Sequence, residues 1–116
     1  MVWLAAAALL IAAAAPDPGR GAALFNRCKI CHSLAAGENR VGPSLHGLFG
    51  RKAGTQSGYD YSPAMRQSGV TWTADTLARY LADPNTFIPG DKMAFPGIKD
   101  AAALADLIAY LQAATR

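Results

Sequence analysis

The sequence predicts an all-α fold, with one small domain of short helices and glycine-rich loops. Its 116 residues leave room for a single domain with a small core. In several places a capping residue precedes apolar residues at three- and four-residue spacing, the pattern of amphipathic helices. Residues 33–61 contain six glycines but neither strand-like alternation nor a helical stripe. This stretch is therefore expected to form loops folded around something else.

The N-terminal segment is expected to be an export signal. Residues 1–15 are almost entirely apolar and rich in alanine, and the composition changes abruptly at Pro16. The run is shorter than the roughly 20 residues of a bilayer span and ends in small residues, as a signal peptide does. We therefore divide the chain into a signal peptide, 1–15, and a domain, 16–116. No Lys or Arg precedes the run, so an uncleaved short anchor stays open as an alternative.

Capping residues place the first two helices. Asp17 and Pro18 predict a helix that runs towards Arg27, with the proline at its first position. Ser62 and Pro63 predict a short helix over 64–68, which Gly69 closes.

Two longer helices follow. Thr73 is expected to cap a helix that ends before Pro84, because the residue before a proline disfavours the α region. A loop rich in proline and glycine is expected over 84–97. Asp100 is expected to cap the last helix. The apolar faces of the two helices are formed by Leu77, Tyr80 and Leu81, and by Leu104, Leu107, Ile108 and Leu111.

The most informative motif is Cys28-Lys29-Ile30-Cys31-His32. Two thiols three residues apart, followed at once by an imidazole, form the attachment signature of a c-type haem. On one turn of helix both sulfurs reach the vinyl groups at one porphyrin edge, while the next side chain points back at the iron. His32 is then the proximal ligand, and the first helix delivers Cys28 to the porphyrin.

Three other kinds of site can contain such a motif. A dithiol redox site is expected between a strand and a helix of a βαβ unit, and nothing in the sequence indicates a parallel sheet. Zinc needs four ligands, and the candidates Cys28, Cys31, His32 and His46 include two adjacent residues. A disulfide between the two cysteines closes too short a loop to add much stability.

The second axial ligand decides between electron transfer and ligand chemistry. Met93 is the candidate, because it lies in a loop framed by prolines and glycines that restrict the position of its thioether. Met65 lies on a short helix, where filling the core is the ordinary role. His46 remains open as an alternative that would give a site with two imidazoles.

The charge pattern argues against nucleic acid as a partner. The formal net charge is only +3, and the sequence has no long basic run and no basic stripe with interleaved aromatic residues.

Several segments together resemble a class I cytochrome c, the group of soluble bacterial periplasmic and mitochondrial carriers with one haem. The likeness extends from about Gly21 to Leu111. It rests on the haem motif, on Val41-Gly42-Pro43 to Lys52-Ala53-Gly54, on Trp72, on Pro89-Gly90-x-Lys92-Met93-x-Phe95, and on Asp106-Leu107-Ile108-Ala109-Tyr110-Leu111.

The resemblance implies a role for each of these positions. Haem c is attached through Cys28 and Cys31, and the iron is held by His32 and Met93. The Pro43 carbonyl accepts a hydrogen bond from His32 Nδ1. Tyr61 and Trp72 donate to the haem propionates, whose charge Arg51 compensates. Tyr80 donates to the Met93 sulfur, and Gly21, Phe25 and Tyr110 form the crossing of the first and last helices.

The resemblance also implies a function. With both axial positions filled, the protein is a one-electron carrier of a respiratory or photosynthetic chain and not an enzyme. It is expected to be a periplasmic monomer that docks onto acidic patches of a cytochrome bc1-type donor and of an oxidase, reductase or photosynthetic reaction-centre acceptor. The cations expected at the haem edge are Arg27, Lys29, Arg40, Lys92 and Lys99. The rivals are an enzyme that uses an open iron position and a membrane-anchored cytochrome subunit.

Two residues depart from the pattern of the family. Asp91 replaces a side chain that donates to a propionate, and an ionised carboxylate has no proton to donate. We expect Asp91 to point to water. Met65 replaces a polar residue beside a buried water, so the internal water network is expected to differ.

Overall fold

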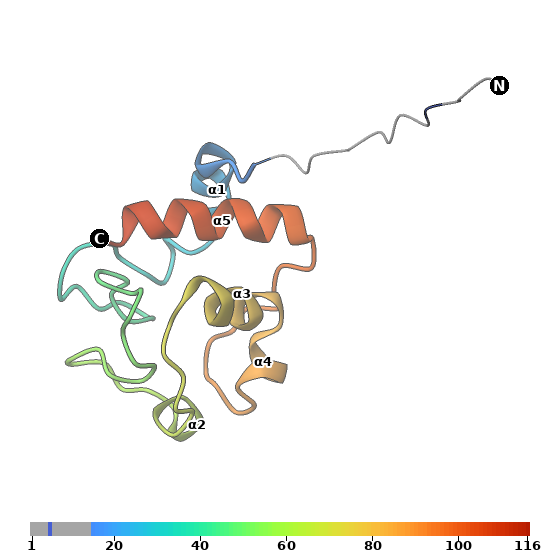
Figure 1. Cartoon of the computed structure of the whole chain (residues 1–116). Coiled ribbons are helices and arrows are strands. Elements are labelled where there is room, and N and C mark those ends of the chain that lie inside the picture. Colours follow the sequence, from blue (N-terminus) through green and yellow to red (C-terminus); the bar gives the residue numbers. More distant parts are fainter. Residues whose placement is uncertain (1–4, 6–14) are drawn as a thin grey trace.

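The computed structural model describes Ala5 and residues 15–116 (Figure 1). The expected signal segment therefore lies outside the described residues, apart from Ala5 and Ala15. In the described part of the chain the elements are helices: α1 (Pro18–Phe25), α2 (Pro63–Arg66), α3 (Ala74–Ala82), α4 (Pro84–Phe87) and α5 (Ala101–Ala114). None of these helices is long and apolar enough to cross a membrane. The predicted all-α fold is confirmed.

The expected caps start the helices. The Asp17 carboxylate accepts a hydrogen bond from the Gly19 amide at 2.8 Å, and the Asp100 carboxylate accepts one from the Ala102 amide at 3.1 Å. Thr73 and Thr76 form a reciprocal capping box at the start of α3. Each cap satisfies an amide that the helix itself leaves without a partner, which explains why these boundaries follow from local sequence.

Two boundaries differ from the prediction. Helix α2 ends at Arg66 and not at Ser68, and the segment predicted as a loop after Ala82 contains the short helix α4. Asp83 is extended and ends α3, while Pro84 supplies the fixed φ of a new first turn. The Thr86 hydroxyl donates to the Asp83 carboxylate at 2.8 Å and steadies this turn. One proline therefore both ends one helix and begins the next.

The core lies where α5 meets α1 and α3 (Figure 1). Helix α5 contributes Leu107, Ile108 and Leu111, and α3 contributes Leu77, Tyr80 and Leu81. Loop residues complete the core with Leu48, Ala53, Trp72, Ile88 and Ile98. Residues 33–61 form turns and loops. Among the described residues, their one β-bridge joins Lys52 to Thr71.

Helices α1 and α5 cross at Gly21, as the sequence predicts. A Cβ at this position would overlap the Asp106 carbonyl and approach Tyr110 Cβ to 2.8 Å, so glycine permits the close approach of the two backbones. Phe25 packs on Tyr110 beside the crossing, with ring centroids 5.3 Å apart.

Replacing Gly21 with alanine is expected to lower the free energy of unfolding by about 1–3 kcal/mol, because the helices must move apart. Urea unfolding of the haem-loaded protein measures the loss. Gly19→Ala is the matched control in the same helix, since its Cβ would meet only the end of the Asp17 side chain, at 3.1 Å. Equal stabilities of the two variants would contradict this account of the crossing.

A buried carboxylate ties the start of α1 to α5. Asp106 is 7% exposed, and it accepts hydrogen bonds from the Asp17 amide at 2.7 Å and from Arg20 Nε at 3.1 Å. These bonds, the Asp17 amide first, hold the pKa of Asp106 below its usual value. The ionised form therefore stabilises the fold above about pH 4, and this contribution is lost as the pH falls through the lowered pKa.

The variant Asp106→Asn is expected to be less stable than the parent at neutral pH and to lose less of its stability on acidification. Urea midpoints measured from pH 7 downwards give both slopes. Asp75→Asn, an exposed carboxylate on α3 with a side chain 69% exposed, is the control. Parallel curves for the parent and Asp106→Asn would refute the assignment of this acid-sensitive contact.

Candidate haem site

The segment after α1 brings two thiols and an imidazole together on consecutive turns. The Cys28 amide donates to the Phe25 carbonyl and the His32 amide donates to the Cys28 carbonyl, each at 2.8 Å. Cys28 and Cys31 therefore lie about one turn apart, as the motif predicts. Both are half-buried free thiols and form no disulfide.

The electrostatics of Cys28 do not resemble those of a dithiol redox enzyme. Burial raises the pKa of the Cys28 thiol, the neighbouring Cys31 raises it further, and Arg27 only partly opposes them. Redox-active cysteines have lowered pKa values, because the thiolate is the reactive form. Among the described residues there is also no group of three or more His, Cys, Asp and Glu side chains arranged to hold a metal ion, as a zinc site would need.

The His32 ring is held from two sides. Its Nδ1 lies 2.7 Å from the Pro43 carbonyl oxygen, and because a carbonyl only accepts, Nδ1 carries the proton. A Cβ on Gly42 would come within 2.7 Å of His32 Nδ1, so the ring lies directly against this glycine. Burial lowers the pKa of His32, the Pro43 bond opposes this effect, and the charge of Arg51 adds to it. In the neutral ring the Pro43 bond keeps the proton on Nδ1, which leaves the lone pair of Nε2 to bind a metal.

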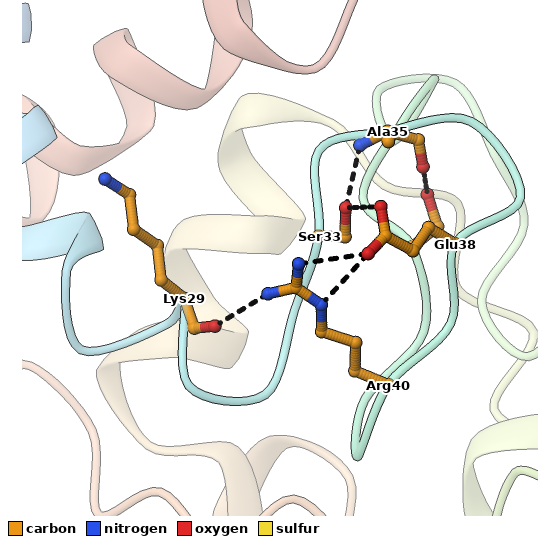
Figure 2. Close-up of polar contacts among 6 residues, drawn as sticks. Lys29, Ser33, Ala35, Glu38 and Arg40 are labelled. Atoms are coloured by element: carbon orange, nitrogen blue, oxygen red, sulfur yellow. Dashed lines mark hydrogen bonds and ion pairs between the residues drawn. The ribbon is translucent and has the colours of Figure 1, made fainter.

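A network in residues 33–44 supports this arrangement. The Gly42 amide donates to the Cys31 carbonyl at 2.8 Å. Figure 2 shows the adjoining contacts, in which Arg40 reaches the Lys29 carbonyl at 3.3 Å and pairs with Glu38 at 3.0 Å. Glu38 in turn accepts from the Ser33 hydroxyl at 2.9 Å. Sequence reasoning missed the roles of Ser33, Glu38 and Gly42, although the near-adjacent opposite charges of Glu38 and Arg40 were a visible signal.

Met93 lies in a loop made of successive turns. The Asp91 amide donates to the Ile88 carbonyl at 3.1 Å, and the Phe95 amide donates to the Met93 carbonyl at 2.9 Å. Between these bonds the Met93 amide donates to Asp91 Oδ1 at 3.2 Å. The Met93 side chain is partly buried against the core. The loop therefore fixes the backbone that carries the thioether.

The expectation that Asp91 points to water is wrong. Its Oδ1 is occupied by the Met93 amide, and its Oδ2 is buried without a hydrogen-bond partner among the described residues. The loop turns the carboxylate inward because Oδ1 closes a turn on the second residue after it, a common use of aspartate in loops.

Lys92 connects the Met93 loop to residues 55–61. Its ammonium group donates to the Asp60 carbonyl and lies 4.7 Å from the centre of the Tyr59 ring. Figure 1 shows both loops on the side of the molecule away from α1. Lys92 was expected to be a docking cation at the haem edge. Its ammonium group is already bound to another loop of the same protein.

Arg51 supplies a positive charge that no described carboxylate balances. Its guanidinium is half-buried and donates to the carbonyls of Ser44 and His46 and to Gln56 Oε1, at 2.7–3.1 Å. Burial lowers the pKa of Arg51. A half-buried cation surrounded only by neutral acceptors is suited to an anionic group such as a haem propionate.

Tyr61 and Trp72 have hydrogen-bond donors to spare. The Tyr61 hydroxyl accepts from the Gln56 amide at 3.1 Å, which leaves its own proton free to donate. The Trp72 ring is 6% exposed and packs on Tyr80 with centroids 5.1 Å apart. No acceptor for its indole N–H lies among the described residues. Both side chains fit the predicted role of propionate donors, which stays a prediction.

Tyr80 is a buried aromatic residue of the core. It is buried on α3 between Trp72 and Phe87. Burial raises its pKa, and the nearby Asp91 carboxylate raises it further. The hydroxyl lies near the Asp91 carboxylate, and its donation to the Met93 sulfur stays a prediction.

The donor set as a whole fits haem c. This cofactor requires two thiols one turn apart, an imidazole with a free Nε2 and a second axial ligand such as a thioether. Its propionates require a positive charge and hydrogen-bond donors, which Arg51, Tyr61 and Trp72 can supply. No described histidine other than exposed His46 competes for the iron, and Met65 packs against the core.

Comparison with known proteins agrees with this site. The family model for cytochrome c matches residues 19–115. Cytochrome c2 of Blastochloris viridis is 48% identical over 107 residues, covering 91% of this chain and 84% of that protein. Cytochrome c of Cochliobolus lunatus is 51% identical over 102 residues, covering 86% and 94% respectively. Among solved structures, cytochrome cH from Methylobacterium extorquens superposes with a TM-score of 0.79 at 45% identity, covering 84% of this chain and 98% of that one. The chain therefore belongs to the cytochrome c family, whose members are electron carriers and not enzymes and bind haem c covalently, here through Cys28 and Cys31.

Proposed function

We propose that His32 and Met93 are the two axial ligands of the haem iron and that the protein carries single electrons between partners of a respiratory or photosynthetic chain. When bound, the haem supplies the one-electron redox couple. The observation that carries the proposal is the bond between His32 Nδ1 and the Pro43 carbonyl, which leaves Nε2 as the free donor. With a thioether on the other side, the iron has no open position for a substrate.

The protein's own residues set the conditions of transfer. His32 is fixed by Pro43 and Gly42, and Met93 by its turns, so little has to move when the charge changes. A soft thioether and a dry pocket both favour the reduced state, so a high potential is expected. A redox titration followed optically tests this function, since the proposal requires one electron per chain. A two-electron or irreversible titration would refute it.

Of the five cations expected at the haem edge, we propose that Arg27 and Lys29 contribute most to steering a partner. Arg40 is paired with Glu38, and Lys99 donates to the Ala82 carbonyl at 2.7 Å with Asp83 3.7 Å away. Arg27 and Lys29 are exposed and form no ion pair with any described residue. These two flank Cys28, so their charge is suited to guide an acidic partner to the attachment edge of the haem.

An apolar pair adjoins these cations. Ile30 and Val41 are 78% and 75% exposed. The contact of Arg40 with Lys29 and that of Gly42 with Cys31 bring the segments that carry Ile30 and Val41 side by side. A small apolar centre with cations beside it suits the brief, weak docking of redox proteins, such as a cytochrome bc1-type donor and an oxidase, reductase or reaction-centre acceptor.

Neutralising Arg27 or Lys29 to glutamine is expected to slow oxidation by anionic hexacyanoferrate(III) by roughly two- to fivefold at low ionic strength, with the difference vanishing in high salt. Stopped-flow kinetics measure the rate. Lys52→Gln, which removes an exposed cation at the bridge to Thr71, is the control. If Lys52→Gln slows the reaction as much as Arg27→Gln, steering depends on net charge and not on this surface.

The proposed location is the periplasm, and the proposed form is a monomer. The alanine-rich run 1–15 supports export, and haem attachment to thiols agrees with the oxidising side of a bacterial membrane. Mass spectrometry of the natural product tests this proposal. A mass with residues 1–15 removed and one haem added supports it, whereas retention of the run favours the membrane-anchored alternative.

A further inference from the structure

We propose that Asp91 is a positioning residue for Met93, and that its carboxylate fixes the loop backbone that holds the thioether towards the iron. The proposal rests on the proposed ligation by Met93. In the family pattern, the residue at this position donates a hydrogen bond to a haem propionate. The role proposed for Asp91 is a different one.

The first observation is the hydrogen bond itself. The Met93 amide donates to Asp91 Oδ1 at 3.2 Å. Of the three hydrogen bonds described for this loop, this is the one that involves a side chain. The other two, from the Asp91 amide to Ile88 and from the Phe95 amide to Met93, join backbone atoms. Changing Asp91 therefore removes one of three bonds while the other two can still form.

The second observation is the burial of the carboxylate. Asp91 Oδ2 is inaccessible to water and has no hydrogen-bond partner among the described residues. The burial of Oδ2 restricts the orientation of the carboxylate, so Oδ1 stays directed at the Met93 amide. Buried groups left without partners are rare and mark places where a protein accepts a cost for function.

The third observation is the anchoring of the neighbours. Lys92 is bound to the Asp60 carbonyl, and Gly90 has φ 90° and approaches the Ala64 side chain closely enough that a Cβ would lie 3.3 Å from it. Lys92 thus ties the chain between Asp91 and Met93 to residues 55–61, while Gly90 lies close to α2. With Lys92 tied in this way, the Asp91 bond sets where the Met93 backbone lies.

The test separates the acceptor of Asp91 from its charge. Asp91→Asn keeps an oxygen acceptor at the same place and loses the charge, whereas Asp91→Glu keeps the charge and moves the acceptor out of the turn. Asp91→Ala removes both, and Asp75→Asn on α3 controls for loss of a carboxylate elsewhere. The probe is imidazole, which binds ferric haem only by displacing Met93. Its Kd and the ferric absorption band of sulfur ligation are measured on the haem-loaded proteins.

Asp91→Ala and Asp91→Glu are expected to bind imidazole about tenfold more tightly than the parent, equivalent to about 1.4 kcal/mol, and to show a weaker sulfur band. Asp91→Asn and Asp75→Asn are expected to stay within about twofold of the parent. If Asp91→Asn matches Asp91→Ala, charge and not position is responsible and the proposal fails. If Asp91→Glu and Asp91→Ala change only the urea midpoint, the role is structural and the proposal also fails. A parent without the sulfur band would overturn the proposed function itself, and this inference with it.

Discussion

Replacing Met93 with alanine is expected to abolish the ferric absorption band of sulfur ligation and to lower the reduction potential by on the order of 0.1 V, because axial ligands tune haem potentials over about 0.8 V. The loss of the thioether also leaves the sixth position open to water and added ligands. Optical spectroscopy and a redox titration of the haem-loaded variant measure both effects.

Met65→Ala is the matched control for this prediction. Met65 is also half-buried and packs against the core, so its removal is expected to lower stability by about 2–5 kcal/mol while leaving the sulfur band and the potential near their parent values. The identification of Met93 would be wrong if Met65→Ala removed the band and Met93→Ala preserved it. A parent that lacks the sulfur band, and whose spectrum changes with His46→Ala but not with Met93→Ala, would instead favour a site with two imidazoles.

Replacing both Cys28 and Cys31 with alanine is expected to abolish covalent haem attachment and, with it, cooperative folding. The domain has about 100 residues, and a chain of that size retains only about 5–15 kcal/mol of net stability even with a complete core. A bound group that contacts several segments contributes to that stability through its preference for the folded state. Residues 33–61 have no helix, and their one β-bridge joins Lys52 to Thr71 outside this stretch, so they depend most on such a group.

Circular dichroism measures this effect. The double variant is expected to lose most of its helical signal and to show no unfolding transition, whereas Cys28→Ala alone keeps one thioether link and a cooperative transition at a lower midpoint. A double variant that melts as cooperatively as the parent would contradict the view that the haem holds the loops in place.

The sequence predicted the helices well because their signals are local. Asp17, Ser62, Thr73 and Asp100 cap as expected, since a side chain that satisfies an amide two or three residues away needs no tertiary contact. The crossing at Gly21 also followed from the sequence, through its resemblance to a known family. Helix α4 was missed because Pro84 was treated only as a terminator, although proline is equally common at a first helical position.

Features that depend on loops meeting in space could not be predicted. Asp91 was expected in water, and its burial depends on how the Met93 loop folds. Lys92 and Arg40 were treated as free surface cations, but Asp60 and Glu38 lie close enough to engage them. The contact of Pro43 with His32 is present as the family resemblance implied, whereas the donation of Tyr80 to Met93 stays a prediction.

The most direct test is the optical spectrum of the purified, matured protein, recorded oxidised and reduced and then with imidazole added. The account predicts one haem per chain, low-spin in both oxidation states, with a ferric band of sulfur ligation that low concentrations of imidazole leave unchanged. A colourless protein, or a coloured one whose ferric form is high-spin and binds imidazole at once, would contradict an iron held between His32 and Met93.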